Sequence, residues 1–137
     1  MEEPLWALAA GCVPDANPWD IPRIAASAGF SASGMWVDPK KSWDKAALGK
    51  AKLSLKETGI QLIDVEAAWL EKSDRANDYH KRIIEAGLEL GARNLLVVSR
   101  HEDYHESVSQ FLEICNMAHN QLRVCIEFGE FTSIKSL

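Results

Sequence analysis

The chain has 137 residues and a formal net charge of −5, with 47% apolar and 26% charged residues. This composition is that of a globular protein that buries one core, and it excludes a disordered or collagen-like chain. The acidic balance and the lack of a basic stripe argue against nucleic-acid binding, since phosphate contacts need clustered Lys and Arg.

Nothing in the sequence points to a membrane. The apolar runs are shorter than the roughly 20 residues of a membrane-spanning helix, and the start lacks the basic segment of a secretory signal. The three cysteines, Cys12, Cys115 and Cys125, are widely spaced and form no CxxC pair. We therefore expect a cytoplasmic protein with reduced, mostly buried thiols.

Apolar segments that favour strands alternate with amphipathic stretches along the chain. In order, the strand-like segments are LWALAAGCV, SASGMWV, IQLIDVEAAWL, NLLVVS and LRVCIEF. Between them, apolar residues recur at helical spacing. The four predicted helices begin at Asn17-Pro18, at Ser42, after Ser73 and at about His105, the last of them running to about Asn120.

Turn residues mark the ends of these helices. Gly29, Gly59 and Gly91 each close one of the first three, where glycine adopts the left-handed conformation that lets the chain leave a helix sharply. Pro22 predicts an irregular start for the first helix. The predicted order is β-α-β-α-β-α-β-α-β.

Strands that alternate with helices favour a parallel sheet, because each helix must carry the chain back to the starting edge. No strand-to-helix junction has a GxGxxG or GxxxxGK[ST] motif, which weakens the case for a nucleotide-binding doubly wound sheet. The sequence therefore predicts an α/β fold of the (β/α)8 TIM-barrel type, of which this chain supplies about four βα units and a fifth parallel strand.

Four segments carry a resemblance to a known family. AGFSASGMWVDP, GIQLIDVEAAWL, LGARNLLVVS and LRVCIEFGEFTSIKSL resemble, in order and spacing, the first five βα segments of the xylose isomerase-like TIM-barrel superfamily, in particular its sugar phosphate isomerase/epimerase branch. DVEAAWL and IEF…SL are the most specific blocks. The resemblance implies that residues 1–137 form a single partial barrel domain, without the family's later βα units.

The resemblance also implies a chemistry. A complete relative would use a divalent ion such as Mn²⁺, Mg²⁺, Co²⁺ or Zn²⁺ to bind two adjacent sugar oxygens. The ion would stabilise an enediolate or a shifting hydride while a carboxylate moves protons. Glu127 matches the metal-binding glutamate at the end of the family's fifth strand, and the other ligands lie on later strands. One carboxylate does not hold a divalent ion tightly, so the alternative for Glu127 is an ion pair at the rim.

Two acids stand close together in the third predicted strand. Asp64 and Glu66 alternate with Ile63 and Val65, so both project from the same face. An acidic pair inside a barrel is unfavourable unless it is solvated, paired or functional. Glu66 lies nearer the carboxyl end of the strand, where such barrels build their active sites, and is the catalytic candidate. The alternative is a structural acid in a salt bridge.

Three further residues are candidates for substrate contacts. Trp36 and Trp69 follow the second and third strands, where an indole ring can stack on a sugar's C–H face, although core packing is the more common role of tryptophan. His101 follows the fourth strand and could contact substrate or metal, or remain a solvated loop residue. The other tryptophans and two histidines have simpler expected roles: packing for Trp6, Trp19 and Trp43, helix surface for His80 and His119.

Two other functions compete with the sugar-chemistry interpretation. HEDYH, from His101 to His105, matches the H-E-x-x-H signature of zinc peptidases, but that motif belongs within one helix and here follows a strand directly. The other alternative is a non-catalytic interaction module. In either case the open edge of a partial barrel predicts self-association, and hence a homo-oligomer.

Overall fold

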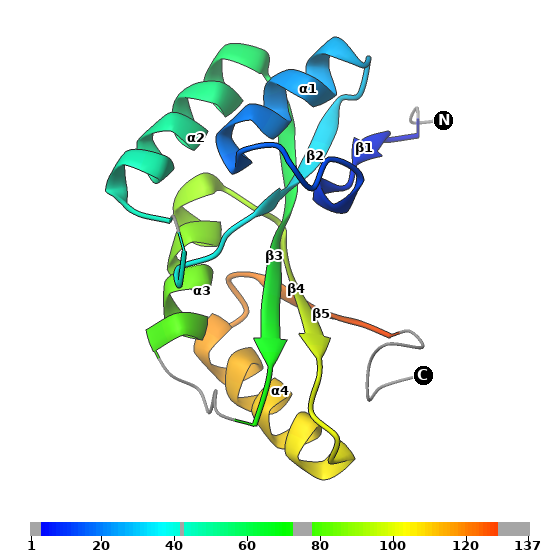
Figure 1. Ribbon diagram of the computed structural model, residues 1–137, viewed down its shortest axis with the longest axis vertical. Helices are drawn as coiled ribbons and strands as arrows, with labels where there is room; N and C mark the ends of the chain where they lie inside the picture. The colour runs from blue at the N-terminus through cyan, green and yellow to red at the C-terminus, as the bar shows by residue number, and fades with distance from the viewer. Residues whose placement is uncertain (1–3, 42, 73–77, 129–137) are drawn as a thin grey trace.

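The computed structural model describes residues 4–41, 43–72 and 78–128. The strands are β1 (Ala7–Leu8), β2 (Ala32–Trp36), β3 (Gln61–Leu70), β4 (Asn94–Ser99) and β5 (Arg123–Glu127). They form one sheet in the order β1-β2-β3-β4-β5, and every neighbouring pair is parallel (Figure 1). The predicted parallel α/β arrangement is confirmed.

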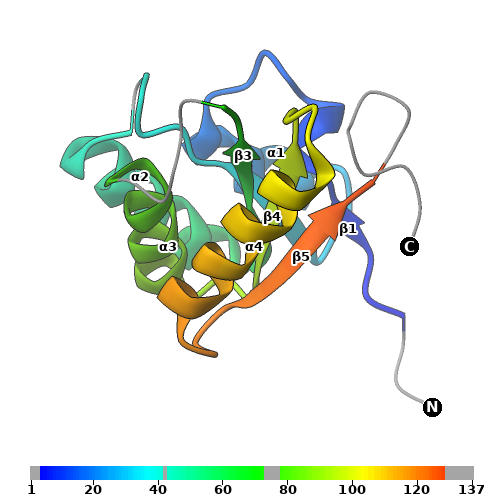
Figure 2. The same ribbon diagram turned by 90° about the horizontal axis from the view of Figure 1, so that it is seen from below.

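Helices connect successive strands. The α-helices of the described residues are α1 (Ile21–Ser27), α2 (Lys45–Thr58), α3 (Asp78–Leu90) and α4 (Tyr104–Ala118), and two 3-10 turns, η1 (Ala10–Cys12) and η2 (Pro18–Asp20), precede α1. Helices α2, α3 and α4 lie along one side of the sheet (Figure 2). None of the helices in the described ranges is long and apolar enough to cross a membrane.

The first strand and the helix starts differ from the prediction. Of LWALAAGCV only Ala7–Leu8 is a strand, because the chain turns into η1 at Ala10. The start of α1 is irregular, as Pro22 predicted, with η2 preceding it. The start of α2 is capped by Asp44, whose side chain accepts a hydrogen bond from the backbone N–H of Ala47 at 2.8 Å. Ser42 and Ser73 lie outside the described residues.

The glycine prediction is confirmed by the backbone. Gly29, Gly59 and Gly91 have φ angles of 84°, 68° and 72°, in the left-handed region. These positions let the chain leave each helix sharply and enter the next strand. The fourth helix ends without a glycine, at His119 with φ 49°.

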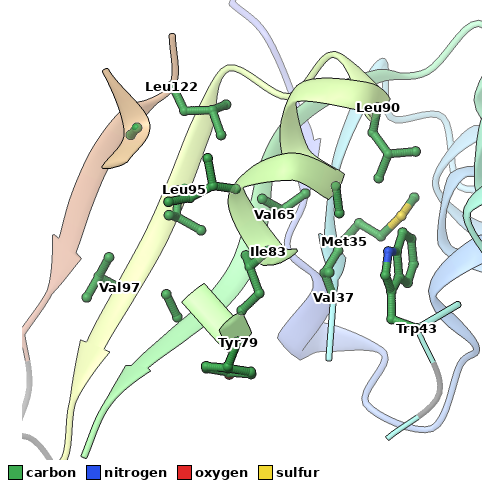
Figure 3. Close-up of a cluster of buried hydrophobic side chains, with 14 of the residues drawn as sticks. Met35, Val37, Trp43, Val65, Tyr79, Ile83, Leu90, Leu95, Val97 and Leu122 are labelled. Atoms are coloured by element: carbon green, nitrogen blue, oxygen red, sulfur yellow. The ribbon is translucent and has the colours of Figure 1, made fainter. Parts of the chain in front are cut away.

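The main core lies between the sheet and the helices on its outer side (Figure 3). Val65 of β3 and Leu95 and Val97 of β4 are fully buried there, against Ile83 of α3. The burial of apolar side chains on this face is the main source of stability for such a fold.

Several packing predictions are wrong. His80 is not on a helix surface: it is fully buried, and its Nε2 lies 2.8 Å from the carbonyl oxygen of Trp69. Trp6 is 68% exposed rather than packed. Trp43 is buried and Trp19 packs against the core, as expected.

The thiols are also more exposed than predicted. Cys12 is exposed, and Cys115 and Cys125 are only partly buried, although all three are free. Cys12 falls in η1 rather than in a strand interior, which explains its exposure.

Candidate functional site

Two carboxylates lie side by side where β2 pairs with β3. Gly34 of β2 is in register with Asp64. A Cβ atom on Gly34 would stand 2.5 Å from Oδ1 of Asp64 and 2.8 Å from Oε1 of Glu66. The two acids therefore project from the same face of β3, as their spacing predicted, and the missing side chain of Gly34 leaves the space that they occupy.

Glu66 is only 8% exposed, and its Oε1 accepts a hydrogen bond from the backbone N–H of Ala10 at 3.3 Å. The pKa of Glu66 is raised from 4.5 to about 7. Burial is the largest cause, followed by the negative charge of Asp64, while the Ala10 hydrogen bond opposes the rise and Glu127 adds a smaller repulsion. Near neutral pH this carboxyl group is populated in both protonation states, which suits it to accept and return a proton.

Asp64, the other acid of the pair, is half-buried. Burial raises the pKa of its carboxyl group as well. Its Oδ1 is buried and has no hydrogen-bond partner within the described ranges. A buried carboxylate oxygen without a partner is unfavourable in a purely structural role, so the pair does not behave as a satisfied salt bridge.

Glu66 opens into a cleft of about 540 Å³. This volume is in the range of small-molecule sites, roughly 300 to 1,000 Å³. The walls come from the carboxyl ends of β2 and β3, from the segments that follow them and from the residue after β4, and include Trp36, Trp69, Asp38, Lys40, Lys41, Glu71, Tyr79 and Arg100. The structure thus brings Glu66 and both candidate tryptophans into one cleft.

Trp69 already carries a partner on its ring. The guanidinium of Arg100 lies 3.7 Å from the ring centroid, and its Nη1 is 3.6 Å from Oε1 of Glu71. One face of Trp69 is therefore covered. Trp36 is half-buried, faces the cleft and packs against the smaller core around Ile21.

Sequence reasoning missed Arg100, Lys40 and Lys41 as cleft residues. The position of Arg100 directly after β4 was an available signal, because residues at the carboxyl ends of parallel strands meet at one edge of the sheet. Lys40 and Lys41 follow β2 through a loop, and only the tertiary structure turns them toward the cleft.

His101 lies apart from Glu66. It is buried and lines a neighbouring hollow together with Lys72, Arg100, Glu102, Asp103, Glu106 and Gln110. Its ring Nδ1 accepts a hydrogen bond from the backbone N–H of Asp103 at 3.1 Å, and the backbone N–H of His101 donates to Ser99 Oγ at 3.2 Å. These contacts hold the turn from β4 into α4.

The peptidase motif has the wrong geometry. Helix α4 begins at Tyr104, so His101 stands before the helix and His105 within it. The two histidines are therefore not one turn apart on a single helix, as a zinc site of this type needs.

Glu127 ends β5 in register with Val98 of β4 and is partly exposed. Its negative charge contributes to the raised pKa of Glu66, so the two carboxylates are close enough to repel each other. Carboxylates are suitable donors for Mg²⁺ or Mn²⁺. However, residues 4–41, 43–72 and 78–128 contain no group of three His, Cys, Asp or Glu side chains placed to hold a metal ion. The described part of the chain does not complete a metal site.

A parallel α/β sheet under an outer layer of helices, with a cleft beside the carboxyl ends of its strands, is characteristic of TIM-barrel proteins. Solved structures support this class. A xylose isomerase domain-containing protein from Salmonella typhimurium superposes with a TM-score of 0.70 at 12% identity, over 98% of this chain and 53% of that one.

Two further solved structures have the same fold. An AP endonuclease of family 2 from Brucella melitensis gives a TM-score of 0.67 at 15% identity, over 96% of this chain and 60% of its own. A sugar phosphate isomerase/epimerase from Parabacteroides distasonis gives 0.57 at 12% identity, over 98% and 56%. No protein-family profile and no curated protein sequence matches the chain.

These likenesses show the fold: the chain is a partial barrel that shares the TIM-barrel fold of these proteins, as its sequence segments predicted. It spans between half and three fifths of the length of these three structures.

Proposed function

We propose that this chain supplies the proton-transfer half of a carbohydrate isomerase or epimerase site, with Glu66 as the catalytic base. The observation that carries the proposal is the position of a nearly buried carboxyl group, with a pKa of about 7, in a cleft that also holds two tryptophans. The substrate is a small sugar or sugar phosphate. The fold likeness to sugar isomerase/epimerase barrels supports this choice.

The chemistry follows from the environment of Glu66. A carbon next to a sugar carbonyl is a weak acid, and a base removes its proton more readily when the pKa of the base is near the working pH. In the proposed reaction the Glu66 carboxylate takes the proton from one carbon. For isomerisation it returns that proton to the neighbouring carbon, while the hydroxyl proton of the enediol passes to the former carbonyl oxygen. Epimerisation would require a proton from a second acid on the opposite face of the same carbon, so Glu66 supplies only the abstraction step of that reaction. The Ala10 N–H holds one carboxyl oxygen in place during the transfer.

The experiment is deuterium incorporation from D₂O into ketose and aldose substrates at the carbon beside the carbonyl, followed by NMR. A general base typically contributes about 10²-fold or more, so Glu66→Gln is expected to lower the exchange rate by that factor. Glu89→Gln is the matched control, because this exposed acid pairs with Lys52 at the helix surface. Equal exchange rates for wild type and Glu66→Gln would refute the assignment.

Glu127 is the proposed metal ligand of the same function. A bound divalent ion would supply Lewis-acid polarisation of the substrate oxygens. Mn²⁺ titration by calorimetry tests this role: binding that Glu127→Gln abolishes and Glu89→Gln retains would support it, and no binding by the wild type would favour the non-catalytic module. Binding that is unchanged in Glu127→Gln would instead assign this acid to an ion pair at the rim.

A second candidate function is a self-associating module, and the edges of the sheet favour it. Leu5 and Trp6 precede β1 and are 46% and 68% exposed, and Phe128 follows β5 and is 49% exposed. Figure 2 shows the β1 and β5 ends on the same open side. We propose that a second copy covers these apolar residues, since such strand edges otherwise promote aggregation.

Sedimentation tests this association. We expect the wild type to sediment as a dimer or larger species, and Trp6→Ser with Phe128→Ser to shift it toward the monomer. Leu53→Ser, on the exposed part of α2, is the control. A folded monomer alone at high concentration would contradict the association.

A further inference from the structure

We propose that Arg100 is the specificity-determining residue of the cleft and that it binds an anionic substituent of the substrate, a carboxylate or a phosphate monoester. This inference rests on the function proposed above for Glu66. It names the part of the substrate that does not react, and it assigns that part to a residue that the sequence had not singled out.

The first observation is how Arg100 is held. Its guanidinium lies over the Trp69 ring at 3.7 Å from the centroid, and this contact restricts the side chain at the cleft wall. A guanidinium that is already oriented loses little side-chain freedom when it binds a ligand. The backbone N–H of Arg100 also donates to Leu70 O at 2.9 Å, which ties the end of β4 to the end of β3.

The second observation is that the hydrogen-bonding capacity of the group is still available. The contact with Glu71 is 3.6 Å long, beyond hydrogen-bond distance, and the Arg100 side chain is 58% exposed. The contact with the ring is made by the guanidinium carbon, so the N–H groups keep the capacity to donate to a ligand. These groups present parallel donors that match the two oxygens of a carboxylate or phosphate.

The third observation is the charge around the cleft. Lys40 and Lys41 line it together with Arg100. Lys41 lies 3.7 Å from Asp38 on the exposed rim, and Lys40 lies over the Tyr79 ring at 4.4 Å from its centroid. Asp38, Glu66 and Glu71 line the same cleft, so its charges are mixed, and Arg100 is the cation of the three that can present a fork of donors to an anionic ligand.

Together these features explain why the cleft would distinguish charged from neutral sugars. A neutral sugar hydroxyl offers one weak acceptor to Arg100. A carboxylate or phosphate offers two charged oxygens to the same fork. In this proposal Arg100 binds the anionic substituent of the substrate, and Glu66 acts on the reacting carbon.

The test compares charged and neutral members of matched pairs: fructose 6-phosphate against fructose, and glucuronate against glucose, by calorimetry at low salt. Hydrogen bonds to charged groups predict roughly tenfold tighter binding of at least one charged member. Arg100→Gln is expected to reduce this preference to less than about twofold. Arg93→Gln, at the opposite end of β4 and 2.7 Å from Gln61, should leave it unchanged.

A second arm uses methyl phosphate and acetate alone, with the shift of the Trp69 indole NMR signal as the readout. A response to one anion and not the other identifies the substituent, and its loss in Arg100→Gln supports the assignment. Arg100→Lys should retain only part of the preference, because an ammonium keeps the charge but not the fork.

The outcomes separate this inference from the function of Glu66. Sugars that bind without a charge preference would overturn the role of Arg100 and leave the proton-transfer proposal standing. Anions that bind at Arg100 while no sugar binds would support the anion contact and refute the sugar chemistry. If no probe binds, or if Arg93→Gln loses as much preference as Arg100→Gln, the inference is wrong.

Discussion

The two faces of β3 and β4 contrast sharply. On the outer face, Val65 and Leu95 are fully buried beneath α3. On the inner face, one residue away in the sequence, Asp64 and Glu66 are acids whose pKa values are raised by burial. A strand alternates its side chains, so one short segment serves both purposes. The outer face provides stability, and the inner face holds polar groups in a state that is unfavourable for stability.

The largest expected change in stability comes from a substitution on the outer face. Leu95→Ala should lower the free energy of unfolding by about 3 kcal/mol, because it removes a fully buried side chain and leaves a cavity. Leu96, the next residue and only half-buried, is the matched control, and Leu96→Ala should cost about 1 kcal/mol. Urea denaturation measures both. Equal losses would show that the inner face is covered as completely as the outer one.

The next effect is the pH dependence that the inner face imposes. The pKa of Glu66 is 4.5 in the unfolded chain and about 7 in the folded one, so between these values the folded state binds more protons. Stability therefore falls as pH rises from about 5 to 8, by about 2 kcal/mol from this group. The raised pKa of Asp64 acts in the same direction.

Glu66→Gln isolates that contribution. The variant should lose most of the decline in stability between pH 5 and pH 8 and should be more stable than the wild type at pH 8, as measured by urea denaturation across the pH range. Glu89→Gln should keep the wild-type profile. A flat profile in the wild type would mean that Glu66 is solvated and would remove the basis of its catalytic assignment.

The smallest effect concerns the space between the two acids. Gly34→Ala places a methyl group 2.5 Å from Asp64 Oδ1, so a carboxylate must move, at an expected cost of about 1 to 2 kcal/mol. Gly49→Ala is a control with an expected effect of opposite sign, because nothing lies within 4 Å of a Cβ atom at that position. In helix α2 it should stabilise the protein by about 0.5 to 1 kcal/mol. Thermal unfolding of both variants checks the difference in sign.

The parts of the site that lie within one strand were predictable. Asp64 and Glu66 share a face because of their spacing alone. Glycines at the helix ends predicted where the chain leaves each helix. The burial of His80 was not predictable, because helix α3 packs more of its surface against the sheet than one apolar stripe indicates. The brevity of β1 was missed for a similar reason: an apolar run extends as a strand only where a neighbour pairs with it.

The sequence by itself determined the order of strands and helices, the parallel sheet and the shared face of Asp64 and Glu66, because periodicity and turn chemistry act over a few residues. Only the tertiary structure decided which residues share a cleft with Glu66. Arg100 reaches Trp69 and Glu71 across 29 or more positions of chain, and the packing of β3 beside β4 brings them together. The pKa of Glu66 is likewise set by burial and by neighbours in space, which no local pattern encodes.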